Sequence, residues 1–195
     1  MPEKRPEYFP GGVYHIYNRG RSRLTIFREP TNYLYVLRNL KKYLGELNLT
    51  LLAYCLMPNH YHLLVRQNGD QPAGRLSQRV FNSYSKAHNQ RYEHSGTIFQ
   101  GPYRVKPVLD ENYMLHLCRY IHANPVSHGF AAAPDLWPYS NFLDWIGQRP
   151  GTLVDRTFIR THFSNVEQYA ASIQAYLQTR TMPSGLSRYL DELEE

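Results

Sequence analysis

Residues 49–66 read LTLLAYCLMPNHYHLLVR, and this stretch decides the fold. Two apolar runs, 49–57 and 60–66, are joined by Pro58-Asn59, a pair typical of a tight turn. The sequence therefore predicts a β-hairpin. His60 and His62 stand at the start of its returning strand. Side chains two residues apart on a strand share a face, so both imidazoles can reach one metal ion.

The His-x-His pair is weak evidence by itself. The chain has 9 histidines in 195 residues, so a random arrangement would contain about 0.4 such pairs. The pair gains weight only if other segments bring a further ligand or a reactive group to the same place.

Helical and strand-like segments alternate on both sides of the hairpin. A strand is predicted over 11–19, a helix over 29–47, a second helix around 76–87, a strand over 98–109 and a third helix over 111–124. Pro102 and Pro107 confine the last strand to an edge or a bulge. Asp110 is a good N-cap for the third helix, and Pro125 is expected to end it. The order βαββαβα favours an α+β, ferredoxin-like fold, with a central antiparallel sheet and helices on one face.

The pattern of predicted elements changes beyond Pro134. A short helix is predicted over 137–146, a break at 149–151 and two more helices within 155–177. We therefore expect one domain over residues 1–148 and a C-terminal helical extension over 149–195, packed on that domain or partly flexible.

Composition bounds the class of protein. The chain is 42% hydrophobic, enough for a real core, but no stretch approaches the roughly 20 apolar residues that cross a bilayer. The charged, Pro-rich start has no apolar signal-peptide centre, so we expect a cytoplasmic protein without membrane contact. Cys55 and Cys118 lie in apolar runs and are expected to be buried, in neither a disulfide nor a zinc site.

The charge pattern favours nucleic acid as a partner. The net charge is +6, and because four acids crowd residues 191–195, residues 1–190 carry +10. The 17 tyrosines offer faces on which unpaired bases can stack. The alternative is that the basic balance serves only solubility.

The third helix offers a reactive group. Met114, Leu117, Cys118 and Ile121 form its apolar stripe, whereas the neighbouring stripe contains Tyr113, His116, Tyr120 and Asn124. Tyr120 is therefore not needed for the core, and its hydroxyl can lie where helix meets sheet, with Asn124 one turn further on. The alternative is that Tyr120 is one of many half-buried tyrosines and that Asn124 merely ends the helix.

Four segments in order resemble a known family. They are YHIYNRG (14–20), YCLMPNHYHLLV (54–65), GTIFQGPYR (96–104) and CRYIHANPV (118–126). Together they resemble the single-tyrosine transposases of the HUH superfamily, and within these the REP-associated tyrosine transposases. The resemblance covers roughly residues 8–146, and four ordered motifs are much more specific than one short pair.

The resemblance implies a nucleoid-associated enzyme that binds imperfect, REP- or BIME-like DNA hairpins and cuts the single-stranded DNA beside them. It implies that Tyr120 is the nucleophile, leaving a 5′-phosphotyrosine and a free 3′-OH. His60 and His62 would hold a divalent metal, Mn²⁺ or Mg²⁺, and Asn124 occupies the place of a third ligand. Asn is shorter than the residue seen there in some relatives, so its direct coordination is open.

Several basic residues are candidates for further roles. Arginines that can contact phosphate are Arg19, Arg21, Arg23, Arg104 and Arg119. The alternative for the loop 20–23 is a solvated charged surface. His15 and His116 are candidates for contacts around the metal ligands.

Two other functions stay open. One is a domesticated hairpin-binding protein without turnover, and the other is a metallohydrolase that activates water and forms no covalent intermediate. We expect a monomer, and a dimer remains open.

Overall fold

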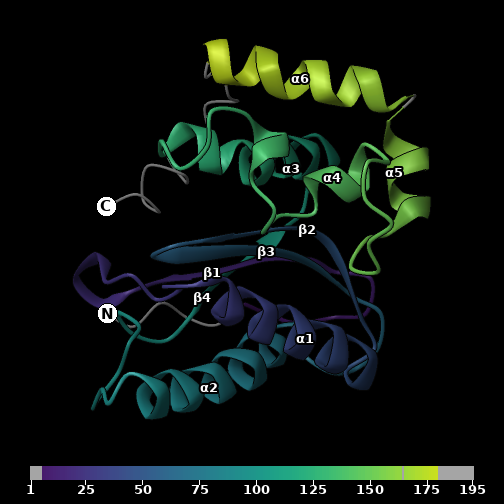
Figure 1. Ribbon diagram of the computed structural model, residues 1–195. Coiled ribbons are helices and arrows are strands. Elements are labelled where there is room, and N and C mark those ends of the chain that lie inside the picture. Colours follow the sequence, from purple (N-terminus) through teal and green to yellow (C-terminus); the bar gives the residue numbers. More distant parts are fainter. Residues whose placement is uncertain (1–5, 164, 180–195) are drawn as a thin grey trace.

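A four-stranded antiparallel sheet in the order β2–β3–β1–β4 forms the middle layer of the molecule (Figure 1). The computed structural model describes residues 6–163 and 165–179. The sheet-forming half contains β1 (Val13–Arg19), α1 (Pro30–Glu46), β2 (Leu49–Met57), β3 (His60–Gln67), α2 (Gly74–Arg91), β4 (Arg104–Val108) and α3 (Glu111–Ser127). After it come α4 (Phe142–Trp145), α5 (Arg156–His162) and α6 (Val166–Thr179), with short 3₁₀ turns at Arg21–Arg23 and Pro134–Leu136. The ferredoxin-like α+β fold is confirmed.

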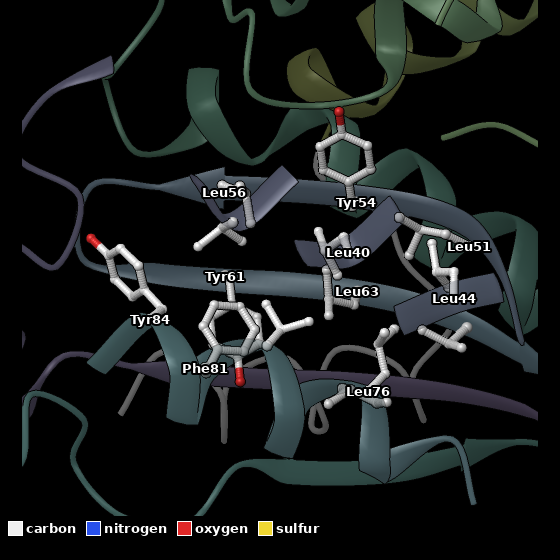
Figure 2. Packing of buried hydrophobic residues seen from close by; sticks show 14 of the residues in the cluster. Leu40, Leu44, Leu51, Tyr54, Leu56, Tyr61, Leu63, Leu76, Phe81 and Tyr84 are labelled. Carbon is white, nitrogen blue, oxygen red and sulfur yellow. The ribbon is translucent and has the colours of Figure 1, made fainter. Parts of the chain in front are cut away.

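Both faces of the sheet are covered, as Figure 1 shows. Helices α1 and α2 lie on one face, as predicted, and α3 lies on the other with the C-terminal helices. Because side chains alternate along a strand, each strand supplies both layers. On β3, Tyr61, Leu63 and Val65 face α1 and α2, where Figure 2 shows Tyr61 and Leu63 among leucines and Phe81. His60 and His62 consequently face α3.

The central hairpin forms as predicted. Met57 pairs with His60 across the two-residue turn Pro58-Asn59. The carbonyl of Pro58 accepts the backbone N–H groups of Ile26 (2.7 Å) and Phe27 (2.9 Å). The turn is therefore held by the segment that follows β1, which fixes the position of the first residue of β3.

Some sequence-based boundaries are wrong, among them that of the short helix predicted over 137–146, of which only α4 (Phe142–Trp145) is helical. The third helix does not end at Pro125 but continues to Ser127. A proline near the end of a helix removes only one backbone bond, and this helix passes it by two residues, with His128 as its C-cap and Gly129, at a φ of +72° that suits a glycine, just beyond. The fourth strand is shorter than predicted, Arg104–Val108, but it is an edge strand as its prolines require. Asp110 caps α3 as predicted, accepting the N–H of Tyr113 at 2.8 Å.

The C-terminal helices are tied to α3 through one buried imidazole. His122 Nε2 lies 2.8 Å from Asn141 Oδ1, and His122 Nδ1 lies 2.6 Å from the hydroxyl of Tyr169 on α6. Since Asn141 Oδ1 is an acceptor, Nε2–H donates to it and Nδ1 accepts the proton of Tyr169. Helices α5 and α6 confirm the two predicted within 155–177. The boundary at 148/149 stays a prediction, and the acidic end at 191–195 lies outside the described residues.

The remaining fold-level expectations concern membranes and cysteines. No helix in the described ranges is long and apolar enough to cross a bilayer. Cys55 and Cys118 are buried, as predicted, and both are free thiols. Burial raises the pKa of each thiol, so neither is set up as a reactive thiolate.

Candidate functional site

A cavity of about 530 Å³ opens where the start of β3 meets the end of β1 and the C-terminal half of α3. The side chains that line it include Tyr17, Arg19, Arg23, His60, His62, Gln100, Arg104, Tyr120 and His128. Its wall therefore combines imidazoles, a phenol and guanidinium groups from four segments that are far apart in the sequence.

The two histidines of the hairpin lie side by side, as their spacing predicts. The ring centroids of His60 and His62 are 5.2 Å apart, with the rings nearly perpendicular at 82°. His62 is buried, 3% exposed, and His60 lies at the rim of the cavity.

His60 lies between two asparagines. Its Nδ1 lies 2.7 Å from Asn59 Oδ1, and its Nε2 lies 3.2 Å from Asn124 Oδ1. Both partners are acceptors, but a neutral imidazole carries one N–H. The shorter contact favours the proton on Nδ1, which leaves a lone pair on Nε2 facing a lone pair on Asn124 Oδ1. A cation between these two atoms would relieve that opposition.

His62 is oriented by a third histidine, His15, which the sequence named as a candidate for contacts around the metal ligands. His15 on β1 is fully buried, and its Nε2 lies 3.0 Å from His62 Nδ1. This pairing uses Nδ1 of His62, so Nε2 is the nitrogen left for a ligand. His15 thus fixes the ring of His62 in the way that outer partners fix metal-ligating histidines.

All three imidazoles are neutral at physiological pH. Burial lowers the pKa of His60 to about 4 and that of His15 to about 3. For His62, burial first and the neighbouring His15 second hold the pKa well below its ordinary value. Only a neutral imidazole offers a lone pair, so His60 and His62 can bind a cation without first losing a proton.

Tyr120 reaches the same place from α3. Its ring centroid lies 5.4 Å from that of His62, edge to face at 80°, and its side chain lines the cavity. It was predicted to lie outside the core stripe, yet it is only 4% exposed and packs among buried residues. The packing fixes the direction of the phenol, and Asn124 follows one turn later as predicted.

His128 lines the cavity, although the sequence analysis did not single it out. His128 follows Asn124 by one more turn, and its ring lies 5.1 Å from that of His60. Its Nδ1 lies 3.0 Å from the carbonyl of Asn124, so Nδ1–H donates there and Nε2 is left for another partner. The signal was present, because positions 120, 124 and 128 keep helical spacing. The false helix end at Pro125 hid it.

The arginines divide into two groups. Arg19, Arg23 and Arg104 line the cavity. Arg21 is exposed outside the lining, and Arg119 points toward α6, where its Nε donates to Ser172 Oγ at 3.1 Å.

The position of Arg23 depends on a glycine. A Cβ at Gly20 would lie 2.1 Å from the carbonyl oxygen of Leu24. Ser22 and Arg23 also adopt φ values of 51° and 59°. The tight turn after β1 is thus needed to aim Arg23 at the cavity.

His116 was predicted, like His15, to lie around the metal ligands. It is half-buried on α3 and does not line the cavity.

A divalent cation at this site would need the side-chain amide of Asn124 as a ligand besides the two histidines. Within residues 6–163 and 165–179, no three His, Cys, Asp or Glu side chains are placed to hold a metal together. His60 and His62 would need the Asn124 oxygen. Adjacent ligands of an octahedral ion with bonds of about 2.1 Å lie about 3.0 Å apart, close to the 3.2 Å between His60 Nε2 and Asn124 Oδ1.

Comparison with known proteins agrees with the fold and the motifs. The family described as "Transposase IS200 like" matches residues 10–124, a range that includes His60, His62, Tyr120 and Asn124. A protein of Haemophilus influenzae named as a REP-associated tyrosine transposase is 28% identical over 162 residues, which are 73% of this chain and 86% of that protein. A solved REP-associated tyrosine transposase bound to a REP hairpin has a TM-score of 0.65 at 20% identity, covering 80% of this chain and 98% of its own.

Proposed function

Because this chain belongs to the family of IS200-like transposases, we propose that it is a metal-dependent endonuclease and strand transferase for single-stranded DNA. Its proposed substrate is DNA beside REP-type hairpins, since the solved relative is bound to a REP hairpin. One observation carries the proposal: Tyr120 packs against His62, beside His60, in a cavity with three guanidinium groups.

The guanidinium groups are suited to holding the DNA backbone. Arg19, Arg23 and Arg104 enter the cavity from β1, the following turn and β4. A guanidinium offers a planar fork of donors to phosphate oxygens and keeps its charge at any physiological pH. Three of them on different sides can fix the path of a strand across Tyr120 without reading its bases.

Tyr120 is the proposed nucleophile. Its Oη attacks the phosphorus of the scissile phosphodiester, an ester forms to the 5′ phosphate, and the bond to the 3′ oxygen breaks. The phenolic proton leaves Tyr120, and the 3′ oxygen departs as a hydroxyl after taking up a proton. One phosphate ester replaces another, so the 3′-OH of a second strand can attack the phosphotyrosine and join DNA without ATP.

His60, His62 and Asn124 are the proposed ligands of a divalent ion, Mn²⁺ or Mg²⁺. When bound, the ion would supply Lewis-acid chemistry at the phosphate oxygens. Two imidazoles and an amide oxygen leave places for water and phosphate, as both ions require, and the nitrogen ligands tilt the preference toward Mn²⁺. His15 contacts His62 Nδ1, so Nε2 is the nitrogen of His62 that would bind the ion.

Two other functions make different predictions. A hairpin-binding protein without turnover would have no use for a nucleophile beside a cation site. A metallohydrolase would cut DNA without a covalent intermediate. A monomer is the expected state for the enzyme, and mass measurement in solution with and without a hairpin tests it.

The experiment uses a hairpin oligonucleotide with single-stranded arms, labelled at either end, with Mn²⁺ or with EDTA. We expect a denaturant-resistant adduct that carries the 3′ label, release of the 5′-labelled fragment, and no reaction in EDTA. Tyr120→Phe should abolish the adduct, whereas Tyr113→Phe, two turns earlier on α3, should not. Cutting without an adduct would favour the hydrolase, and binding without cutting the hairpin-binding protein.

A further inference from the structure

A second, smaller hollow adjoins the cavity that contains Tyr120. Its volume is about 210 Å³, and its walls come from β1, β3, α2 and the segment between α2 and β4. Asn18, Gly101 and Pro102 line both hollows. The segment Gly101-Pro102 is thus a partition shared by the two hollows, and a strand that occupies one hollow lies next to the other.

The two hollows differ in charge. Three arginines line the first, whereas in the described part of the chain no charged side chain lines the second. The second is bounded by aromatic rings, including Phe99 and Tyr103, and by carboxamides, including Gln78 and Asn82. A phosphate favours the first environment. An unpaired nucleobase favours the second, because rings stack on its face and carboxamides both donate to and accept from its edge.

The floor of the second hollow is preorganised. Tyr61 stacks on Phe81 with centroids 3.7 Å apart, and both rings meet Phe99 edge to face. The hydroxyl of Tyr61 bonds to Ser77 Oγ at 2.6 Å, so the buried polar groups of the floor satisfy each other. A base entering the hollow would therefore meet rigid rings below.

The rim carries the groups that can distinguish bases. Gln78 and Asn82 are exposed and stand one turn apart on α2, so both reach the same side of the opening. Asn18 Nδ2 donates to the carbonyl of Gly101 at 3.1 Å and holds the partition in place. Nothing lies within 4 Å of a Cβ built on Gly101, which leaves room for a strand to cross.

We propose that this hollow binds one unpaired nucleobase of the strand whose phosphate occupies the Tyr120 cavity, with Gln78 and Asn82 as determinants of which base is accepted. The inference rests on the proposed function, since it assumes single-stranded DNA in the first cavity. It gives the segment 96–104, conspicuous in the sequence, a physical role as the partition between phosphate and base.

The first test measures binding without cleavage. Tyr120→Phe protein is mixed with a hairpin oligonucleotide selected for binding from a pool with randomised arms, and 2-aminopurine is placed at each arm position in turn. We expect quenching of fluorescence, at least 3-fold, at a single position. Adding Gln78→Ala and Asn82→Ala should remove it, whereas Gln90→Ala, an exposed glutamine on the same helix outside the hollow, should not.

The second test measures cleavage by protein with Tyr120 intact. An abasic site at that same position should lower kcat/KM at least 10-fold, and less than 3-fold in the Gln78→Ala/Asn82→Ala variant, which should unfold at the same temperature as the starting protein. No quenching at any position, or equal quenching and equal abasic sensitivity in both proteins, would overturn the inference. If no adduct forms at all, the proposed function fails, and the fluorescence test still decides whether the hollow holds a base.

Discussion

Replacing His15 by Phe tests whether this residue orients the proposed metal ligand His62. The change keeps an aromatic ring of similar size beside Tyr17, on which His15 stacks with centroids 5.1 Å apart. It removes the Nε2 atom 3.0 Å from His62 Nδ1. With Nε2 of His62 left for a ligand, Nδ1 carries the proton, and in the variant this buried Nδ1–H has lost its acceptor.

Two magnitudes follow from this geometry. A buried donor left without its partner costs about 1–3 kcal/mol, so the free energy of unfolding of the metal-free protein should fall by that amount. Loss of a partner that orients a ligating imidazole typically lowers metal affinity about 10- to 100-fold. His15→Gln retains an acceptor oxygen and should recover part of both losses.

The assays are urea unfolding in EDTA and titration with Mn²⁺, with free Mn²⁺ measured by electron paramagnetic resonance. His116→Phe is the matched control, because His116 is half-buried on α3 outside the cavity. The reasoning would be refuted by wild-type Mn²⁺ affinity in His15→Phe, or by an equal loss of affinity in His116→Phe.

Three further predictions concern the loop and the helix contacts. Arg23→Ala should weaken hairpin binding and reduce the slope of log affinity against log salt by about 1. Arg21→Ala should have a smaller effect, because Arg23 lines the cavity and Arg21 does not. Equal effects of the two changes in salt titrations would contradict the assignment. Gly20→Ala should lower the free energy of unfolding by about 1–3 kcal/mol, because its Cβ would lie 2.1 Å from the Leu24 carbonyl oxygen; chemical denaturation showing no change would exclude that clash. Burial lowers the pKa of His122 to about 4, against about 6.5 in an unfolded chain, so the unfolded state binds more protons between these values and stability falls as the pH falls through them. Between pH 7 and pH 5 this loss is about 2 kcal/mol, and denaturation curves of His122→Gln should show a pH dependence smaller by that amount, an expectation that unchanged dependence would reject.

Local patterns were sufficient for much of the fold. The bounds of β2 were correct because an unbroken apolar run ends at a turn-forming pair, and Asp110 was correct because a capping carboxylate acts on the N–H three residues ahead. Pro125 was misjudged by the same kind of reasoning. Whether a proline ends a helix depends on what the residues after it can bind, and here the helix continues to Ser127, followed by the C-cap His128 and by Gly129.

The candidate site was only partly visible in the sequence. Period two along β3 places His60 and His62 on one face, and the helical stripe of α3 aligns Tyr120 with Asn124. The same stripe would have supplied His128 if the helix had been extended. Arg119 was chosen for its charge, yet it bonds to Ser172 on α6, a helix whose packing the sequence did not specify.

The sequence by itself determined which residue types the chain offers and which of them share a strand face or a helix stripe, because those periodicities arise from bonds between near neighbours. Only the tertiary structure decided that His15 meets His62 and that the partition at Gly101 divides an arginine-lined cavity from an aromatic one. These contacts depend on the pairing of β1 with β3 and of α2 with the segment before β4. His15 and His62 are 47 residues apart in the sequence. The register of β1 against β3, which brings them together, is set by packing of the whole core.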